Sequence, residues 1–79
     1  MVFLEAAMNG PSRGVIKRIY RPLGVGIIDS EEGDIIFTPE SVRGRREGFD
    51  NLSEGRPVNY RKYPSNIGDS AFADDVWPD

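Results

Sequence analysis

Short runs of β-branched and aromatic residues, each ended by glycine or proline, restrict the fold of this chain more than any other feature. Five such runs occupy residues 14–20, 23–29, 34–37, 56–63 and 71–77. Val, Ile, Tyr and Phe favour strands, whereas Gly and Pro interrupt them. No stretch of eleven or more residues has helical periodicity. The sequence therefore predicts an all-β fold, a small five-stranded antiparallel barrel, since closure removes exposed sheet edges.

The segment "PLGVGIID" places Gly24 and Gly26 inside the second run. A dinucleotide-binding loop needs a third glycine and a following helix, and a Walker loop needs Gly-Lys-Ser/Thr. The segment has neither pattern. Glycine inside a strand instead indicates a bulge, a sharp bend or a close backbone approach, as a tightly coiled barrel requires.

The composition excludes several classes of site. The chain has 79 residues, a net charge of −3, and neither cysteine nor histidine. Disulfides, cysteine or histidine zinc sites and histidine-dependent triads are therefore excluded. A chain of this length has little room for a substrate cleft. We expect one small domain that is not an enzyme and uses no metal and no cofactor.

The N-terminal segment differs in character from the rest. Residues 1–13 are predicted to form a flexible leader, and residues 14–79 the barrel domain. "MVFLEAAM" has no basic start and is too short to span a membrane. We therefore expect a cytoplasmic protein without a membrane partner. Met1 and Met8 both remain possible native starts.

Five stretches, in order and spacing, resemble the cold-shock domain family: "GVIKRIY", "LGVGII", "DIIFTPESV", "GFDNLSEGRPVNY" and "AFADDV". The resemblance covers Gly14 to Val76. It implies an OB-type barrel that binds single-stranded RNA or DNA through outward aromatic side chains. It also implies that Tyr60 is a core residue.

Most of the family's binding-face aromatic positions carry aliphatic, cationic or other residues here. The altered positions are Arg18, Val25, Ile27, Ile36, Thr38 and Pro39, while Lys17 and Phe49 keep the family's residue type. Base stacking on an aromatic ring contributes about 1–3 kcal/mol, so losing several rings costs on the order of 5 kcal/mol of binding. The resemblance thus predicts a divergent member with a weakened or altered binding mode.

Two hypotheses about function follow. In the first, the protein binds single-stranded nucleic acid, with a role such as transcription-linked regulation. Its predicted contacts are Lys17, Arg18, Tyr20, Arg21, Arg43, Arg45, Arg46 and Phe49. Arginines pair with phosphates and also stack on bases through the guanidinium plane.

In the second hypothesis, the altered face binds a protein of the transcription or translation machinery. The predicted patch contains Val25, Ile27, Ile36, Thr38 and Pro39. An apolar patch rimmed by polar groups is typical of an interaction site. The leader is a further candidate to cover this patch.

Four other features are interpreted as structural. Phe37 is expected to point into the barrel. Trp77 is expected to cap one end of the barrel. The acidic segment "DSEEGD" lacks the spacing of a calcium loop and is expected to be a solvated hairpin turn. Residues 41–55 are expected to form a long polar loop.

Overall fold

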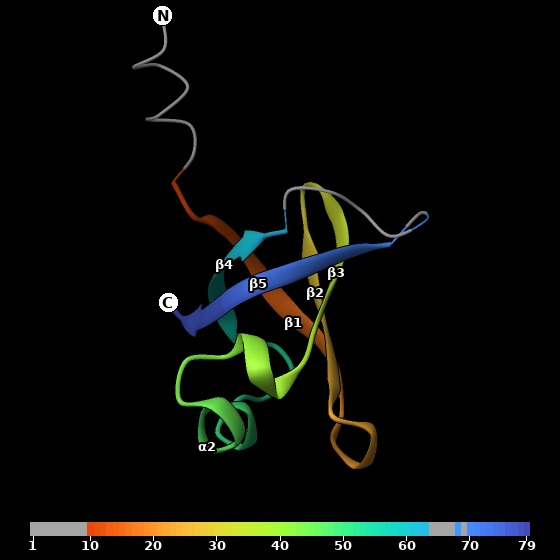
Figure 1. Ribbon diagram of the computed structural model, residues 1–79. Coiled ribbons are helices and arrows are strands. Elements are labelled where there is room, and N and C mark those ends of the chain that lie inside the picture. Colours follow the sequence, from red (N-terminus) through yellow and green to blue (C-terminus); the bar gives the residue numbers. More distant parts are fainter. Residues whose placement is uncertain (1–9, 64–67, 69) are drawn as a thin grey trace, which may run out of the picture.

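The computed structural model describes residues 10–63, 68 and 70–79 as a five-stranded barrel (Figure 1). The strands are β1 (Ser12–Tyr20), β2 (Val25–Ser30), β3 (Gly33–Phe37), β4 (Pro57–Lys62) and β5 (Ala71–Pro78). Two 3₁₀ turns, η1 (Arg21–Leu23) and η2 (Pro39–Ser41), and one short helix, α2 (Arg45–Asp50), complete the described chain. The all-β fold and the closed barrel confirm the prediction.

The start of β1 differs slightly from the predicted domain boundary. Ser12 and Arg13 pair with Tyr60 and Asn59 of β4, so they belong to the barrel rather than to the leader. Residues 1–9 of the predicted leader lie outside the described residues, as do residues 64–67 and 69 between the fourth and fifth predicted strands.

The strand order around the barrel is β1-β2-β3-β5-β4. Four neighbouring pairs are antiparallel, but β3 and β5 run parallel, through the partners Ile35–Ala71 and Ile36–Phe72. The barrel is therefore antiparallel, as predicted, except at this one seam. A closed ring with an odd number of strands cannot alternate direction all the way round, so one parallel pair is unavoidable.

The core consists of inward residues from every strand and from the segment before β4. Its members are Ile16, Ile28, Ile35, Phe37, Val42, Phe49, Leu52, Val58, Tyr60, Ala73 and Val76. Alternation along each strand produces this pattern, because successive side chains point to opposite faces of a sheet. Phe37 and Tyr60 are buried as predicted.

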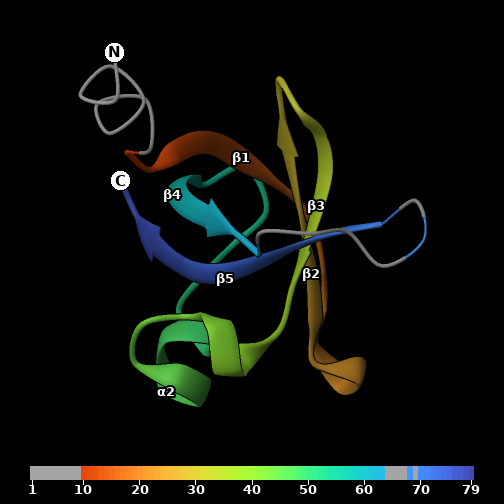
Figure 2. The same ribbon diagram turned by 45° about the horizontal axis from the view of Figure 1, so that its top comes forward.

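The segment before β4 is not the polar loop that its sequence suggests. It contains η2 and α2, and it buries Val42, Phe49 and Leu52. The ring of Phe49 lies edge-on to Phe37, with 5.9 Å between the ring centroids. This segment therefore closes one end of the barrel, with α2 beneath the strands (Figures 1 and 2).

Gly26, the second residue of β2, packs closely against Phe37 of β3. The two residues are register partners, and both are buried. A Cβ atom built on Gly26 comes closer than 3.0 Å to three ring atoms of Phe37. The glycine is thus required by close packing, as its position inside a strand indicated.

We predict that Gly26→Ala lowers the free energy of unfolding by about 1–3 kcal/mol, because Phe49 leaves the Phe37 ring no room to move away. Urea unfolding followed by Trp77 fluorescence measures this loss. Phe37→Leu in the Gly26→Ala background is the matched comparison, and it should be less destabilising there than in the parent chain. Equal losses in both backgrounds would contradict the packing argument.

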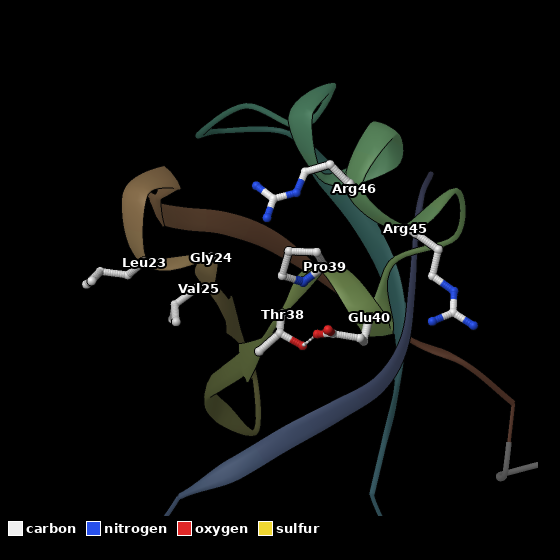
Figure 3. A pocket seen from close by; sticks show the side chains of 8 residues that line it. All are labelled: Leu23, Gly24, Val25, Thr38, Pro39, Glu40, Arg45 and Arg46. Atoms are coloured by element: carbon white, nitrogen blue, oxygen red, sulfur yellow. Dashed lines mark hydrogen bonds between the residues drawn. The ribbon is translucent and has the colours of Figure 1, made fainter.

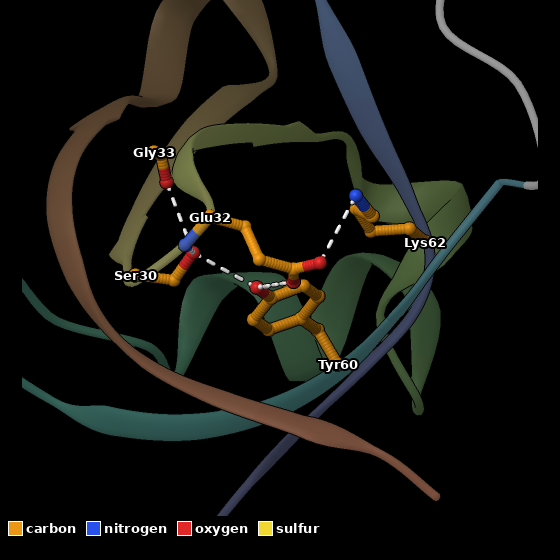
Figure 4. A network of polar contacts seen from close by, with 5 residues as sticks. All are labelled: Ser30, Glu32, Gly33, Tyr60 and Lys62. Atoms are coloured by element: carbon orange, nitrogen blue, oxygen red, sulfur yellow. Dashed lines mark hydrogen bonds and ion pairs between the residues drawn. The ribbon is translucent and has the colours of Figure 1, made fainter. Parts of the chain in front are cut away.

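A polar network covers the other end of the barrel (Figure 4). The Tyr60 hydroxyl oxygen lies 2.6 Å from Oε1 of Glu32 and 2.9 Å from Oγ of Ser30. Nζ of Lys62 lies 3.0 Å from Oε2 of Glu32. A phenol has one proton, and the carboxylate is the stronger acceptor at the shorter distance, so Tyr60 donates to Glu32. The acidic turn is therefore a hairpin turn, as predicted, but Glu32 is tied to the barrel rather than merely solvated.

This network shifts two pKa values in opposite directions. Hydrogen bonds from Tyr60 and Lys62 hold the pKa of Glu32 below its ordinary value. Burial, reinforced by the neighbouring Glu32, raises the pKa of the Tyr60 phenol. A lowered carboxyl pKa adds stability above the unfolded-state pKa, and that contribution disappears as the pH falls through the folded-state pKa. The network thus stabilises the protein at neutral pH and ceases to do so in acid.

We predict that Tyr60→Phe lowers the free energy of unfolding at pH 7 by about 1.5 kcal/mol, because Glu32 loses a charge-assisted hydrogen bond. The difference from the parent chain should narrow well below about pH 4, where Glu32 is protonated in both proteins. Thermal unfolding at a series of pH values measures it. A difference that stays constant between neutral and strongly acidic pH would contradict the linkage.

Candidate nucleic-acid interface

One row of outward side chains crosses four strands of the barrel. Arg18 of β1 is paired with Ile27 of β2, Ile27 with Ile36 of β3, and Ile36 with Phe72 of β5. The flanking residues of β2, β3 and β5 point into the core. Ile27, Ile36 and Phe72 are half-buried, whereas Arg18 is exposed. We call these four residues the Arg18 row.

A register shift in β1 positions Arg18 in this row. Ile16 pairs with Ile28, but Arg18 pairs with Ile27, so Lys17 is an extra residue in β1. Such a bulge increases the local twist and redirects side chains. Lys17 and Arg18 are consequently both exposed, although they are neighbours in a strand.

Tyr20 and Val25 lie beside the row, two register steps along, where β1 ends and β2 begins. The Tyr20 side chain is 42% exposed. The surface therefore offers one aromatic ring on β1 and another, Phe72, on β5. The sequence interpretation included Tyr20 but missed Phe72. The small inward residues Ala71 and Ala73 on either side of Phe72 carry the signal that places it outward.

Three of the predicted cationic contacts already have protein partners. Lys17 pairs with Asp34 at 3.2 Å. Arg21 donates to the backbone carbonyls of Phe49 and Leu52. These contacts hold β1 to β3 and η1 to the end of α2, so these side chains have a structural role.

Arg43 is the third engaged cation. Its guanidinium forms two hydrogen bonds with the Asp75 carboxylate, at 3.1 and 2.9 Å, and lies 3.8 Å from the centroid of the Trp77 ring. The Asp75 carboxylate raises the pKa of Arg43. Trp77 is half-buried beneath this side chain. Arg43 thus fastens the segment before α2 to β5.

Arg18, Arg45 and Arg46 differ from the engaged cations. Within residues 10–63, 68 and 70–79, their side chains form no ion pair and no hydrogen bond. All three are exposed. These guanidinium groups are therefore the predicted cations that remain available to an external anion.

Phe49 is a correction to the predicted site. Its side chain is fully buried against Phe37, so it offers no surface to a base. Its aromatic character serves the core, because α2 folds over the end of the barrel and carries Phe49 inward. The expectation of a polar loop hid this role.

Part of the predicted patch and two of the predicted arginines meet in one open depression of about 540 Å³ (Figure 3). It is lined by Leu23, Gly24, Val25, Thr38, Pro39, Glu40, Arg45 and Arg46. Thr38 donates a hydrogen bond to Glu40 at 3.2 Å. The η1 turn supplies Leu23, which is 75% exposed and which the sequence interpretation did not include. We call this depression the η1–α2 pocket.

A second cavity, of about 340 Å³, lies at the other end of the barrel between Ser12, Arg13, Glu31, Glu32 and Tyr60. Two of its charged groups are already paired, Arg13 with Asp79 and Glu32 with Tyr60 and Lys62. In the described ranges, no three His, Cys, Asp or Glu residues are grouped to hold a metal ion. The same part of the chain contains no helix long and apolar enough to cross a membrane.

No protein-family description and no curated protein matches this chain. The cold-shock resemblance therefore stays a prediction from the sequence motifs. The barrel architecture is compatible with it but does not identify the family.

We predict that Arg21→Ala lowers the free energy of unfolding by about 1 kcal/mol, because two backbone carbonyls lose a charged donor. Arg18→Ala should leave stability within about 0.5 kcal/mol of the parent, since it removes no internal contact. Parallel urea titrations of the two variants measure the difference. Equal stability of both variants would show that Arg21 is not a structural residue.

Proposed function

We propose that this protein binds single-stranded nucleic acid, RNA or DNA, across the Arg18 row and the neighbouring Tyr20. The observation that carries the proposal is that Arg18, beside Ile27, and Arg45 and Arg46, beside Val25 and Pro39, form no ion pair and no hydrogen bond with the residues that the structure describes. The phosphate groups of a nucleic acid would supply anionic partners for these guanidinium groups. The binding role is non-enzymatic and suits a regulator of transcripts or of transcription.

The two exposed or half-exposed rings provide the stacking surface. Tyr20 and Phe72 stand at opposite sides of the surface, with Ile27 and Ile36 between them. Adjacent strands are about 4.8 Å apart, so the row across β1, β2, β3 and β5 accommodates several consecutive nucleotides. Each stacked base contributes about 1–3 kcal/mol. The cold-shock pattern has more aromatic rings for stacking than the two present here. We therefore expect weak binding that depends strongly on ionic contacts.

We predict that a labelled oligo-dT of about ten nucleotides binds with a slope of about −2 in a plot of log K against log salt. Three arginines that contact phosphates, at about −0.7 per contact on a single strand, account for this slope. Fluorescence anisotropy between low and moderate salt measures it. No binding at low salt, or a slope near zero, would contradict the proposal.

The same titration with variants locates the site. Arg18→Ala should reduce the slope by about 0.7, and Phe72→Ala should weaken binding roughly tenfold at constant salt. Arg56→Ala is the matched control, because Arg56 is an exposed arginine outside the Arg18 row and the η1–α2 pocket. If Arg56→Ala weakens binding as much as Arg18→Ala, the binding is nonspecific attraction rather than recognition by this face.

A further inference from the structure

We propose that the η1–α2 pocket is a docking site for an acidic peptide segment that carries an aliphatic side chain. This goes beyond the proposed function, because it assigns a protein partner to a surface next to the Arg18 row. The partner is defined by its chemistry, which is one or two aliphatic residues flanked by carboxylates.

The apolar part of the pocket is preformed. Leu23 is the last residue of the 3₁₀ turn η1, in which Pro22 follows the first residue, Arg21. None of the turn's residues is buried. Gly24 follows in the left-handed conformation, and its N–H donates to the carbonyl of Arg21 at 3.1 Å. Pro39 lies across from Gly24 and fixes the opposite wall. An exposed leucine on a fixed turn presents its surface to a partner with little loss of conformational entropy.

The charged part of the pocket is also fixed by the backbone. Arg45 has φ of 54°, which is uncommon for a residue with a side chain, and it follows Gly44 with φ of 87°. The Arg45 N–H donates to the carbonyl of Val42 at 2.8 Å. Figure 3 shows that Arg46 extends over Pro39 towards Gly24, whereas Arg45 points away beyond Glu40. Two separated guanidinium groups match two carboxylates on either side of an apolar residue.

The lining favours a peptide over a nucleic acid. None of its eight residues has an aromatic ring, so a base would find no stacking partner there. Glu40 also lies in the pocket, with its carboxylate near Thr38. A nucleic acid on the Arg18 row uses Arg45 and Arg46 only for phosphates outside the pocket, because a strand inside it would bring a phosphate beside Glu40 at every nucleotide. A peptide carries charge only at chosen side chains, and its backbone N–H groups can donate to Glu40.

The test uses the full chain and a short fluorescein-labelled peptide in which two leucines are flanked on both sides by aspartates. A second peptide replaces both leucines with serine. We expect binding of the leucine peptide, detected by anisotropy, and amide shift changes in isotope-labelled protein confined to η1, η2 and α2. The serine peptide should bind at least about tenfold more weakly, because the apolar contact is lost.

Variants separate this site from the Arg18 row. Leu23→Ser and Arg46→Ala should each weaken peptide binding roughly tenfold while the chain stays folded, because both residues are exposed. Val15→Ser is the matched control, since Val15 is another exposed aliphatic residue, on β1 and outside the pocket. Phe72→Ala should leave peptide binding unchanged, and Leu23→Ser should leave oligo-dT binding unchanged.

Three results would overturn the proposal. One is the absence of any shift change at about 1 mM peptide. Another is equal affinity for the leucine and serine peptides. The third is displacement of the leucine peptide by oligo-dT together with loss of both ligands in Leu23→Ser, which would make the pocket part of a nucleic-acid site. If oligo-dT does not bind but the leucine peptide does, the proposed function is contradicted and the peptide-docking proposal is not.

Discussion

The Phe37 ring, packed on the bare backbone of Gly26, connects the barrel core to α2 and its two arginines. The ring occupies the space in which any other residue at position 26 would place its Cβ. Its outer edge meets Phe49, and this contact draws α2 onto the end of the barrel. Since α2 begins with Arg45 and Arg46, their position depends on a glycine two strands away in the chain. A core contact of this kind affects the surface because it fixes the position of the short segments that pack against it.

The odd number of strands has a second consequence for the surface. It requires one parallel pair, which here is β3 with β5, and these two strands share only two register pairs. That short seam brings Phe72 beside Ile36 and extends the outward row from three strands to four. The row would otherwise hold one arginine and two isoleucines, with no ring at that side. The barrel's closure therefore supplies an aromatic group that the cold-shock alignment does not assign to the binding face.

The strands and most of the core follow from local patterns. Alternation in "DIIF" buries Ile35 and Phe37 and leaves Ile36 outward, and no distant information is needed. The failures lie where the deciding contact is remote in sequence. The six residues of α2 are too few for a periodic signal, and Phe49 is buried only because Phe37 is there to receive it. Likewise, nothing local distinguishes Arg18, which pairs with none of the described residues, from Arg43, whose partner Asp75 is 32 residues away. The residue types identified the cationic side chains. Ion pairing with residues distant in the sequence decides which of these side chains are available to a ligand.

The acidic tip of the β2–β3 hairpin and the arginines of α2 lie at opposite ends of the barrel. The tip of the β2–β3 hairpin, with Glu31 and Glu32, lies at the end opposite η1 and α2 in both ribbon views (Figures 1 and 2). At physiological ionic strength, charges are screened over about 8 Å, so an anion near Arg45 and Arg46 is influenced mainly by those arginines and by Glu40 beside them. At very low salt, screening extends to about 30 Å and the acidic hairpin contributes repulsion. The net charge of −3 therefore opposes approach from a distance without cancelling local contacts. This arrangement favours ligands that make short-range contacts with the unpaired arginines over polyanions that are merely attracted to a basic protein.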